Sequence, residues 1–174
     1  MIEVSISAAA RERLDDLRPL YFALYEHERK ISPIPMTEPR ERARRERRAT
    51  YAQAFADGRA LLLIAEDGDA LVGYAFALLH EANDDTFELA PRYAELYSLA
   101  VAPGLRSGGI GTALVQALDA NLSELDVTAL IVAVTTTNHD ALRFYQRLGL
   151  IPVETLLYRF TSAGDGCGSS SVRR

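Results

Sequence analysis

The sequence predicts a mixed α/β fold of the α+β kind, in which helices flank a mostly antiparallel sheet that also holds a parallel pair of strands. Strand-like segments at 59–66, 70–79 and 92–101 predict an antiparallel half-sheet. The Asp67-Gly68 step between the first two predicts a hairpin, because glycine tolerates the positive φ that tight turns need. A glycine-rich turn, an amphipathic helix and an apolar segment at 127–135 follow. The right-handed crossover rule makes that segment parallel to the strand before the turn.

Length and composition place these elements in one domain. The chain has 174 residues, within the ~100–200 residues of a single domain. We assign residues 1–160 to this domain and expect the Gly/Ser-rich tail at 161–174 to be disordered. Hydrophobic residues make up 48% of the chain and charged residues 25%, as in an ordinary soluble globular protein.

Charge and cysteine content argue against several classes of function. The net charge of −5 argues against a general affinity for nucleic acid. No apolar run approaches the ~20 residues that span a bilayer, so no membrane partner is expected. Cys167 is the only cysteine, so neither a disulfide framework nor a cysteine-based metal site is available. These features predict a cytoplasmic protein.

The N-terminal third is predicted to hold a short strand and two helices. Residues 1–5 alternate as a strand, and residues 9–30 repeat apolar side chains at helical spacing. Three prolines in 31–39 end that helix, and a second helix covers 38–57. Six arginines lie between Arg40 and Arg48. They form either a solvated face with i, i+4 ion pairs or a patch that recruits an acidic acceptor or partner.

Three elements complete the predicted domain. Segment 127–135 is apolar throughout and is expected to be a strand buried on both faces. A short helix at 138–148, ended by Gly149, precedes a last strand at 150–160. Pro152 is acceptable in that strand only near its start or at an edge of the sheet.

The turn at 103–111 is predicted to bind an anion such as phosphate. The first amides of a helix have no intrahelical partner and the helix dipole is positive there. A Walker A loop is excluded, because Ile110 and Gly111 stand where Lys and Ser/Thr are required. A dinucleotide fingerprint starting at Gly109 is excluded, because it places Leu114 where a small residue must let helix and strand pack.

Two motifs in this region resemble those of the GNAT superfamily of N-acetyltransferases. Motif A of that family is a (Q/R)-x-x-G-x-(G/A) loop that wraps the pyrophosphate of acetyl-CoA, and its counterpart here is Arg106-x-x-Gly109-x-Gly111, preceded by Val101-x-Pro103. Motif B resembles Asn138-x-x-Ala141-x-x-Phe144-Tyr145-x-x-x-Gly149. The resemblance covers about residues 60–160, with the motifs in the family's order.

The resemblance implies a GNAT-like acyl-CoA N-acyltransferase fold, whose central parallel strands start paired and then splay apart. The pantetheine arm of acetyl-CoA, the implied co-substrate, can pair with the exposed strand edge as an added strand. The residues expected to contact acetyl-CoA are Leu99, Ala100, Val101, Arg106, Ser107, Gly108, Gly109, Ile110, Gly111, Thr112, Asn138 and Tyr145. Asn138 either caps its helix or contacts pantetheine.

Glu95 and Tyr145 are the candidate catalytic residues. Period two along the strand places Glu95 on one face with Tyr93, Tyr97, Leu99 and Val101, provided that no bulge intervenes. Superfamily members that use a glutamate base on this strand place it where Glu95 stands. The alternative for Glu95 is a charge paired with Arg92 or with solvent.

Tyr145 matches the motif B tyrosine that protonates the CoA thiolate in many relatives, and the same side chain would pack its helix on the sheet. His80 and His139 show no partner pattern and are expected to be ordinary histidines.

The implied function is acetyl-CoA-dependent N-acetylation of a primary amine by direct transfer in a ternary complex, without a metal. The acceptor would be a small-molecule or peptide amine, surrounded by the N-terminal helices and an acidic loop at 81–88. The alternative is a non-catalytic acyl-CoA-binding module of the same fold. Family members commonly add two strands after motif B, but one is predicted here. The sheet therefore either ends one strand early or borrows a strand from a partner in a homodimer.

Overall fold

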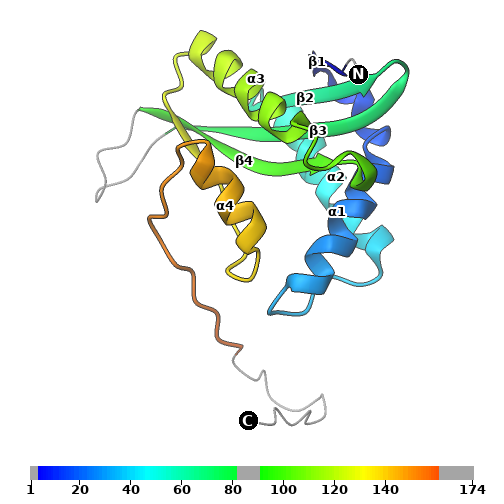
Figure 1. Ribbon diagram of the computed structural model, residues 1–174, viewed down its shortest axis with the longest axis vertical. Helices are drawn as coiled ribbons and strands as arrows, with labels where there is room; N and C mark the ends of the chain where they lie inside the picture. The colour runs from blue at the N-terminus through cyan, green and yellow to red at the C-terminus, as the bar shows by residue number, and fades with distance from the viewer. Residues whose placement is uncertain (1–3, 82–90, 161–174) are drawn as a thin grey trace.

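The computed structural model describes residues 4–81 and 91–160, and it shows a single sheet with helices on both faces (Figure 1). The five strands lie in the order β1-β2-β3-β4-β5. Neighbouring strands are antiparallel from β1 to β4, whereas β4 and β5 are parallel. This arrangement confirms the predicted fold class.

The N-terminal elements are β1 (Val4–Ala9), the 3-10 turn η1 (Arg11–Asp15) and the helix α1 (Arg18–Ile31). The single helix predicted at 9–30 is therefore wrong in its first half. Pro19 explains the boundary, because proline lacks an amide proton and fits only the first turn of a helix.

The central elements follow the predicted order closely. They are α2 (Arg40–Ala56), β2 (Ala60–Asp67), β3 (Ala70–Glu81) and β4 (Arg92–Val101). The hairpin between β2 and β3 is confirmed, and its Gly68 has a φ of 59°. Most of the acidic loop predicted at 81–88, the first three residues and the tail at 161–174 lie outside the described residues.

The C-terminal elements are the 3-10 turn η2 (Pro103–Leu105), α3 (Ile110–Glu124), β5 (Ala129–Ile131) and α4 (His139–Arg147). The strand predicted at 127–135 is wrong in length and in burial. Only three residues form β5, and Ile131 is 45% exposed. The physical reason is that β5 is the outermost strand of the described sheet, so nothing covers its far side there.

The strand predicted at 150–160 is also wrong, because these residues pair with no strand in the described part of the chain and residues 151–160 are exposed. As a result, the parallel pair β4–β5 lies at one end of the described sheet and not at its centre.

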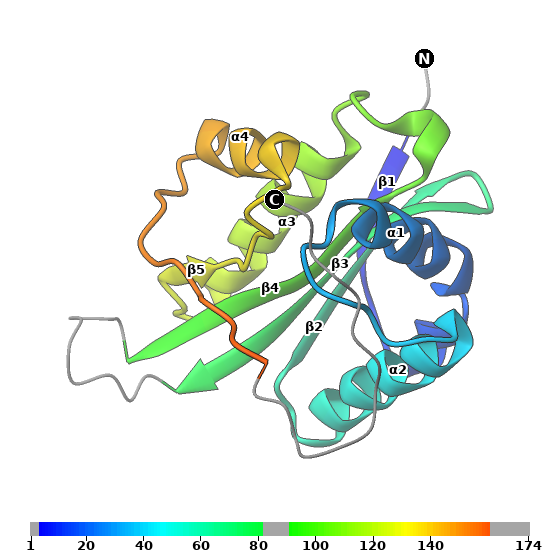
Figure 2. The same cartoon turned by 90° about the horizontal axis from the view of Figure 1, so that it is seen from below.

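Two apolar cores lie on opposite faces of the sheet. Figure 2 shows α3 and α4 on one side of the strands and α1 and α2 on the other. On one face α3 and α4 pack on the strands, with Leu114 and Leu118 fully buried. On the other face α1 and α2 cover β2 and β3, and the Tyr51 and Phe76 rings stack with centroids 3.7 Å apart.

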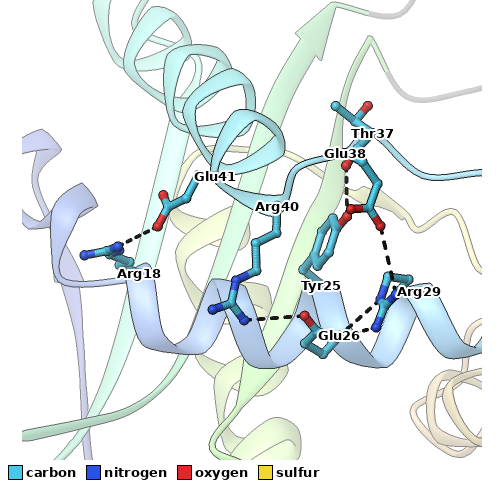
Figure 3. Close-up of polar contacts among 8 residues, drawn as sticks. All are labelled: Arg18, Tyr25, Glu26, Arg29, Thr37, Glu38, Arg40 and Glu41. Carbon is cyan, nitrogen blue, oxygen red and sulfur yellow. Dashed lines mark hydrogen bonds and ion pairs between the residues drawn. The ribbon is translucent and has the colours of Figure 1, made fainter.

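Polar contacts join α1 to α2 and to the segment between them (Figure 3). Arg18 lies 2.5 Å from Glu41, and the Tyr25 hydroxyl donates to the Thr37 carbonyl at 2.9 Å. Arg40 also faces Glu26, at 3.5 Å. These contacts, together with the pairs Arg42–Glu46, Arg44–Glu41 and Arg48–Asp15, support a solvated, ion-paired face for the α2 arginines.

Candidate active site

The parallel pairing of β4 with β5 stops at Glu95. Only Tyr93, Ala94 and Glu95 pair with β5, opposite Ala129–Ile131. β4 continues to Val101 while the chain after Ile131 leaves the ladder. The β5-facing edge of β4 therefore has no strand partner from Leu96 onward among the described residues. This geometry is the splay that the family resemblance implies.

The open edge of β4 leads directly into the glycine turn. Ser107 and Gly109 have positive φ angles of 66° and 87°, which reverse the chain before α3. Gly109 is the N-cap of α3, and no side chain caps this end of the helix. The first backbone bond of α3 runs from the Ala113 amide to the Gly109 carbonyl at 2.9 Å. The amides of Ile110–Thr112 are therefore available to an anion.

The turn also borders an open groove of about 450 Å³. The exposed Arg106 side chain lies there, with Nε donating to the Val101 carbonyl at a long 3.5 Å. Ile110 is buried and anchors the turn against the sheet. A Cβ atom at Gly111 would lie 3.5 Å from the Phe144 ring, and one at Gly108 would lie 3.3 Å from the Leu105 carbonyl. A bulky side chain at either glycine would therefore meet a neighbour.

A β-bulge divides β4 into two halves with different side-chain directions. Phe76 pairs with Ser98 whereas Ala77 pairs with Leu96, so Tyr97 is the extra residue. Glu95 lies opposite Leu78, which packs on the α1/α2 side, whereas Leu99 belongs to the α3/α4 core. The prediction that Glu95 shares a face with Leu99 and Val101 is therefore wrong.

The structure gives Glu95 a partner that sequence reasoning missed. His80 Nε2 lies 3.3 Å from Glu95 Oε2, and it has no hydrogen-bond partner within the described ranges. The His80 ring stacks on Tyr93 with centroids 4.8 Å apart. Arg92, the partner considered from sequence, instead lies 3.4 Å from Glu81. The contact follows from the position of His80 opposite Tyr93 on the neighbouring strand. That register depends on the bulge, so it could not be read from the sequence.

A polar clamp holds the residue after the bulge. The Ser98 hydroxyl accepts a hydrogen bond from Tyr51 at 2.7 Å and another from Arg47 at 3.1 Å. Arg47 also lies 3.7 Å from Glu28. Burial raises the pKa of the Glu28 carboxyl, and the nearby Arg47 charge opposes this increase. Arg47 thus differs from the other α2 arginines, because it turns inward and ties α1 and α2 to β4.

Tyr145 lies on the opposite face of the sheet from Glu95. Its side chain is 9% exposed within the α3/α4 core. Burial raises the pKa of its hydroxyl to about 12. The hydroxyl therefore remains protonated at neutral pH and is able to donate a proton or a hydrogen bond. Two candidate groups on opposite faces can approach one substrate only through an opening in the sheet, and the splay after Glu95 provides one.

The loop that follows β5 bridges the sheet to α1. The Thr137 hydroxyl donates to the carbonyl of Ile31 at the end of α1. The next residue, Asn138, is the N-cap of α4, and its side chain accepts a hydrogen bond from the Ala141 amide at 3.1 Å. Of the two roles considered for Asn138, helix capping is the one visible in the structure.

Residues 4–81 and 91–160 contain neither a metal-binding cluster nor a membrane-spanning helix. No group of three or more His, Cys, Asp and Glu side chains there is arranged to hold a metal ion. No helix in those ranges is both long enough and apolar enough to cross a bilayer.

Curated relatives of the chain carry a consistent name. A mycothiol acetyltransferase of Saccharomonospora viridis is 33% identical over 101 residues, which is 58% of this chain and 32% of that protein. A mycothiol acetyltransferase of Propionibacterium freudenreichii is 28% identical over 82% of this chain and 41% of that protein. The chain spans less than half the length of these two relatives.

Solved structures share the fold at low sequence identity. A GCN5-related N-acetyltransferase from Ralstonia eutropha has a TM-score of 0.73 at 17% identity and covers 90% of this chain and 98% of its own. An aminoglycoside antibiotic 6'-N-acetyltransferase from Acinetobacter haemolyticus has a TM-score of 0.66 at 17% identity, covering 91% and 98%. A predicted acetyltransferase from Clostridium acetobutylicum, solved with acetyl-CoA, has a TM-score of 0.71 at 13% identity, covering 90% and 96%.

The model of the acetyltransferase (GNAT) family matches residues 18–150, which include α1, the open edge of β4, the glycine turn and α4. This chain belongs to the GNAT family of acetyltransferases.

Proposed function

We propose that this chain is an acetyl-CoA-dependent N-acetyltransferase that acetylates a primary amine by direct transfer in a ternary complex. The observation that carries the proposal is the continuity between the open edge of β4 and the uncapped start of α3. One supplies unpaired backbone groups along a strand, and the other supplies free amides at a positive helix end. The strand groups suit the amides of the extended pantetheine arm of acetyl-CoA, and the helix amides suit its diphosphate.

The residues present fit acetyl-CoA as co-substrate. The backbone of Leu99–Val101 would pair with the pantetheine amides, as in strand addition. The amides of Gly109–Thr112 would bind the pyrophosphate. Arg106 is exposed beside this turn and would add a charge-assisted bond to a phosphate oxygen.

Glu95 and Tyr145 are proposed to act from the two faces of the sheet. Glu95 would accept the proton of the attacking amine, directly or through water, with His80 beside it. Tyr145 would donate a proton to the leaving thiolate. Direct transfer in a ternary complex is the mechanism that the family resemblance implies, and it is part of this proposal. The absence of a metal from the reaction and the cytoplasmic location remain predictions.

A small-molecule amine is the proposed acceptor. A further structural neighbour, an aminoglycoside acetyltransferase from a soil metagenomic sample in complex with sisomicin, is 18% identical to this chain with a TM-score of 0.62. The α1/α2 side of the splay presents Glu95, His80 and Tyr97. A carboxylate near an aromatic ring suits a cationic amine.

Substitution at the glycine turn tests binding. Gly109→Ala should weaken acetyl-CoA binding at least roughly tenfold, because alanine at a φ of 87° displaces the amides that would bind phosphate. Gly58→Ala is the matched control, since Gly58 also has positive φ and open space around its Cβ position but follows α2. Isothermal titration calorimetry measures both. Equal affinity in both variants would contradict the proposed pyrophosphate site.

An acceptor-dependent assay separates the enzyme from a binding module. Release of free CoA thiol would be measured with acetyl-CoA and a panel of amines that includes sisomicin. Tyr145→Phe and Glu95→Gln should each lower kcat about 10²-fold or more while acetyl-CoA still binds. Glu26→Gln, on the exposed side of α1, should leave kcat unchanged. Amine-dependent turnover that both site variants retain would assign the two residues structural roles. Acetyl-CoA binding without turnover on any amine would support the non-catalytic module.

A further inference from the structure

A small crevice lies between α1 and α2, with β3 beneath it. Its volume is about 20 Å³, which is enough for one particle of the size of a water molecule. Four arginines line it: Arg18, Arg44, Arg47 and Arg48. Among the described residues, no Asp or Glu side chain lines it. The crevice therefore gathers positive charge beside the arginine-rich part of α2.

Three tyrosines complete the polar lining of the crevice. They are Tyr21 on α1, Tyr51 on α2 and Tyr74 on β3. Burial raises the pKa of all three hydroxyl groups, that of Tyr21 to about 12. The hydroxyl groups therefore keep their protons at neutral pH. Every polar side chain that lines the crevice is thus able to donate a hydrogen bond, and the guanidinium groups can only donate.

The hydroxyl group of Tyr74 is buried in this lining without a partner. Tyr74 is 0% exposed, and its hydroxyl has no hydrogen-bond partner in the part of the chain that the structure describes. The neighbouring hydroxyl groups of Tyr51 and Ser98 hydrogen-bond to each other, at 2.7 Å. A buried hydroxyl without a partner is unfavourable, so native proteins supply one from the chain, from water or from a bound ion. A particle in the crevice would be that partner.

The ion pairs around the crevice leave one positive charge over. Arg18 and Arg44 share Glu41, at 2.5 and 3.1 Å. Figure 3 shows the first of these pairs, between α1 and α2. Arg44 and Arg48 share Asp15, at 3.7 and 2.7 Å. Three guanidinium groups thus face two carboxylates, and one monovalent anion would balance the remaining charge.

Arg47 brings a further positive charge close to the Tyr74 hydroxyl. Burial raises the pKa of Tyr74, and the nearby Arg47 charge is among the groups that oppose this increase. Arg47 itself is balanced by Glu28 at 3.7 Å, so the excess charge stays with the other three arginines. A water molecule would satisfy Tyr74 alone, whereas an anion would satisfy Tyr74 and also balance that excess. The lining therefore favours an anion.

We propose that this crevice binds one monatomic halide ion of the size of chloride, held by the Tyr74 hydroxyl and the surrounding arginines. An oxyanion such as sulfate is too large for a space of about 20 Å³. The bound ion joins α1 and α2 to β3 and thereby stabilises the folded chain. The site goes beyond the proposed function and does not depend on it, because it shares no residue with the glycine turn or with Glu95 and Tyr145.

Thermal unfolding at constant ionic strength tests the site, with sodium chloride replacing sodium gluconate, whose anion is too large for the crevice. A chloride titration should raise Tm in a saturable way and give the Kd. At about five times that Kd, Tm should be higher by roughly 2–4 °C, because only the folded chain binds the ion. No saturable rise of Tm with chloride would overturn the proposal.

Substitution of the unpartnered tyrosine tests the same site. Tyr74→Phe should weaken chloride binding at least roughly tenfold, because it removes the buried donor while keeping the ring. In gluconate the same variant should be no less stable than the unmodified chain, since no partner is lost there. Tyr158→Phe is the matched control, because Tyr158 is 66% exposed and outside the crevice. Equal chloride affinity in Tyr74→Phe and the unmodified chain would overturn the proposal.

Long-wavelength crystallography on the unmodified chain keeps the proposal testable if Tyr74→Phe fails to fold. Crystals grown in sodium chloride should show an anomalous peak beside the Tyr74 hydroxyl, because chloride scatters anomalously and water does not. Density without an anomalous signal would identify a water molecule and overturn the proposal. An anomalous peak without a rise of Tm in solution would mean binding at crystal concentration only, and would also overturn it.

Discussion

The two sides of β4 are held in different ways. Toward β3, an antiparallel ladder pairs residues from Gly73 opposite Val101 to Glu81 opposite Arg92, interrupted only by the bulge. Toward β5, three parallel pairs form and the ladder then stops. A continuous ladder uses the backbone groups of a strand for folding, whereas an interrupted one leaves them for a ligand. The candidate site lies where the ladder between β4 and β5 stops and the backbone groups of β4 become unpaired on that side.

The same contrast extends to the side chains. In the antiparallel part, from β1 to β4, the aromatic ring of Phe76 is fully buried against Tyr51. In the C-terminal part, from β5 to residue 160, Phe160 is 72% exposed. Apolar residues of the antiparallel part thus pack within the chain, whereas those of segment 151–160 are exposed in the described structure.

The largest expected loss of stability comes from a substitution that disrupts the antiparallel core. Phe76→Ala should lower the free energy of unfolding by about 3–5 kcal/mol, because it leaves a cavity under the Tyr51 ring. Phe160→Ala should change the free energy of unfolding by no more than about 0.5 kcal/mol, because the Phe160 side chain is exposed. Urea denaturation followed by circular dichroism measures both. Similar losses in the two variants would show that segment 151–160 is part of the folded core.

The next effect concerns the one well-buried tyrosine of the C-terminal part. Burial raises the pKa of Tyr145 from 10.0 to about 12 in the folded chain. Below pH 10 both states keep the proton, so this group adds no pH dependence. Between pH 10 and 12 only the unfolded state releases it, so stability should fall by about 1.4 kcal/mol per pH unit from this group.

Tyr145→Phe should remove that part of the alkaline slope in unfolding experiments at several pH values. The other buried tyrosines retain their own contributions in both proteins, so the difference between the two curves reports Tyr145. Parallel curves for the two proteins would show that this hydroxyl ionises as it does in water.

A smaller effect is expected at the clamp beside the bulge. Ser98→Ala should cost about 1–3 kcal/mol, because it leaves the Tyr51 hydroxyl and the Arg47 guanidinium without their shared acceptor. Ser123→Ala on the exposed side of α3 is the matched control. If Tyr51→Phe and Ser98→Ala gave fully additive losses, their hydrogen bond would contribute nothing to stability.

The smallest effect is expected on the surface of the antiparallel part. Arg42→Ala removes an exposed i, i+4 pair with Glu46 and should cost about 0.3–0.5 kcal/mol. Raising the salt concentration should reduce this difference further. A loss as large as that of Ser98→Ala would mean that the arginine face of α2 contributes to stability beyond surface ion pairing.

Predictions from sequence succeeded where local signals decide the structure. The Asp67-Gly68 step sets the hairpin, and Gly109 with its positive φ ends the turn before α3. They failed where the outcome depends on a distant neighbour. An apolar segment at 127–135 predicts a buried strand only if another strand covers it, and the described sheet provides none beyond β5.

The bulge at Tyr97 shows why the candidate site was only partly predictable. Assigning alternate residues to the two faces of the sheet is correct within each half of β4. The assignment reverses at the extra residue, Tyr97, which nothing in the sequence marks. The same extra residue helps set the register that brings His80 opposite Tyr93 and beside Glu95. The glycine turn needed no such information, because its conformation depends on glycines within a few residues.

The sequence by itself determined the order of the elements, the glycine turn with its free amides and the two family motifs. These depend on backbone preferences and on spacing along the chain, which act over a few residues. Only the tertiary structure decided that β4 and β5 part after Glu95, that Glu95 and Tyr145 lie on opposite faces, and that residues 151–160 are exposed. Those outcomes depend on strand register and on which surfaces meet, and both are set by contacts between residues far apart in sequence.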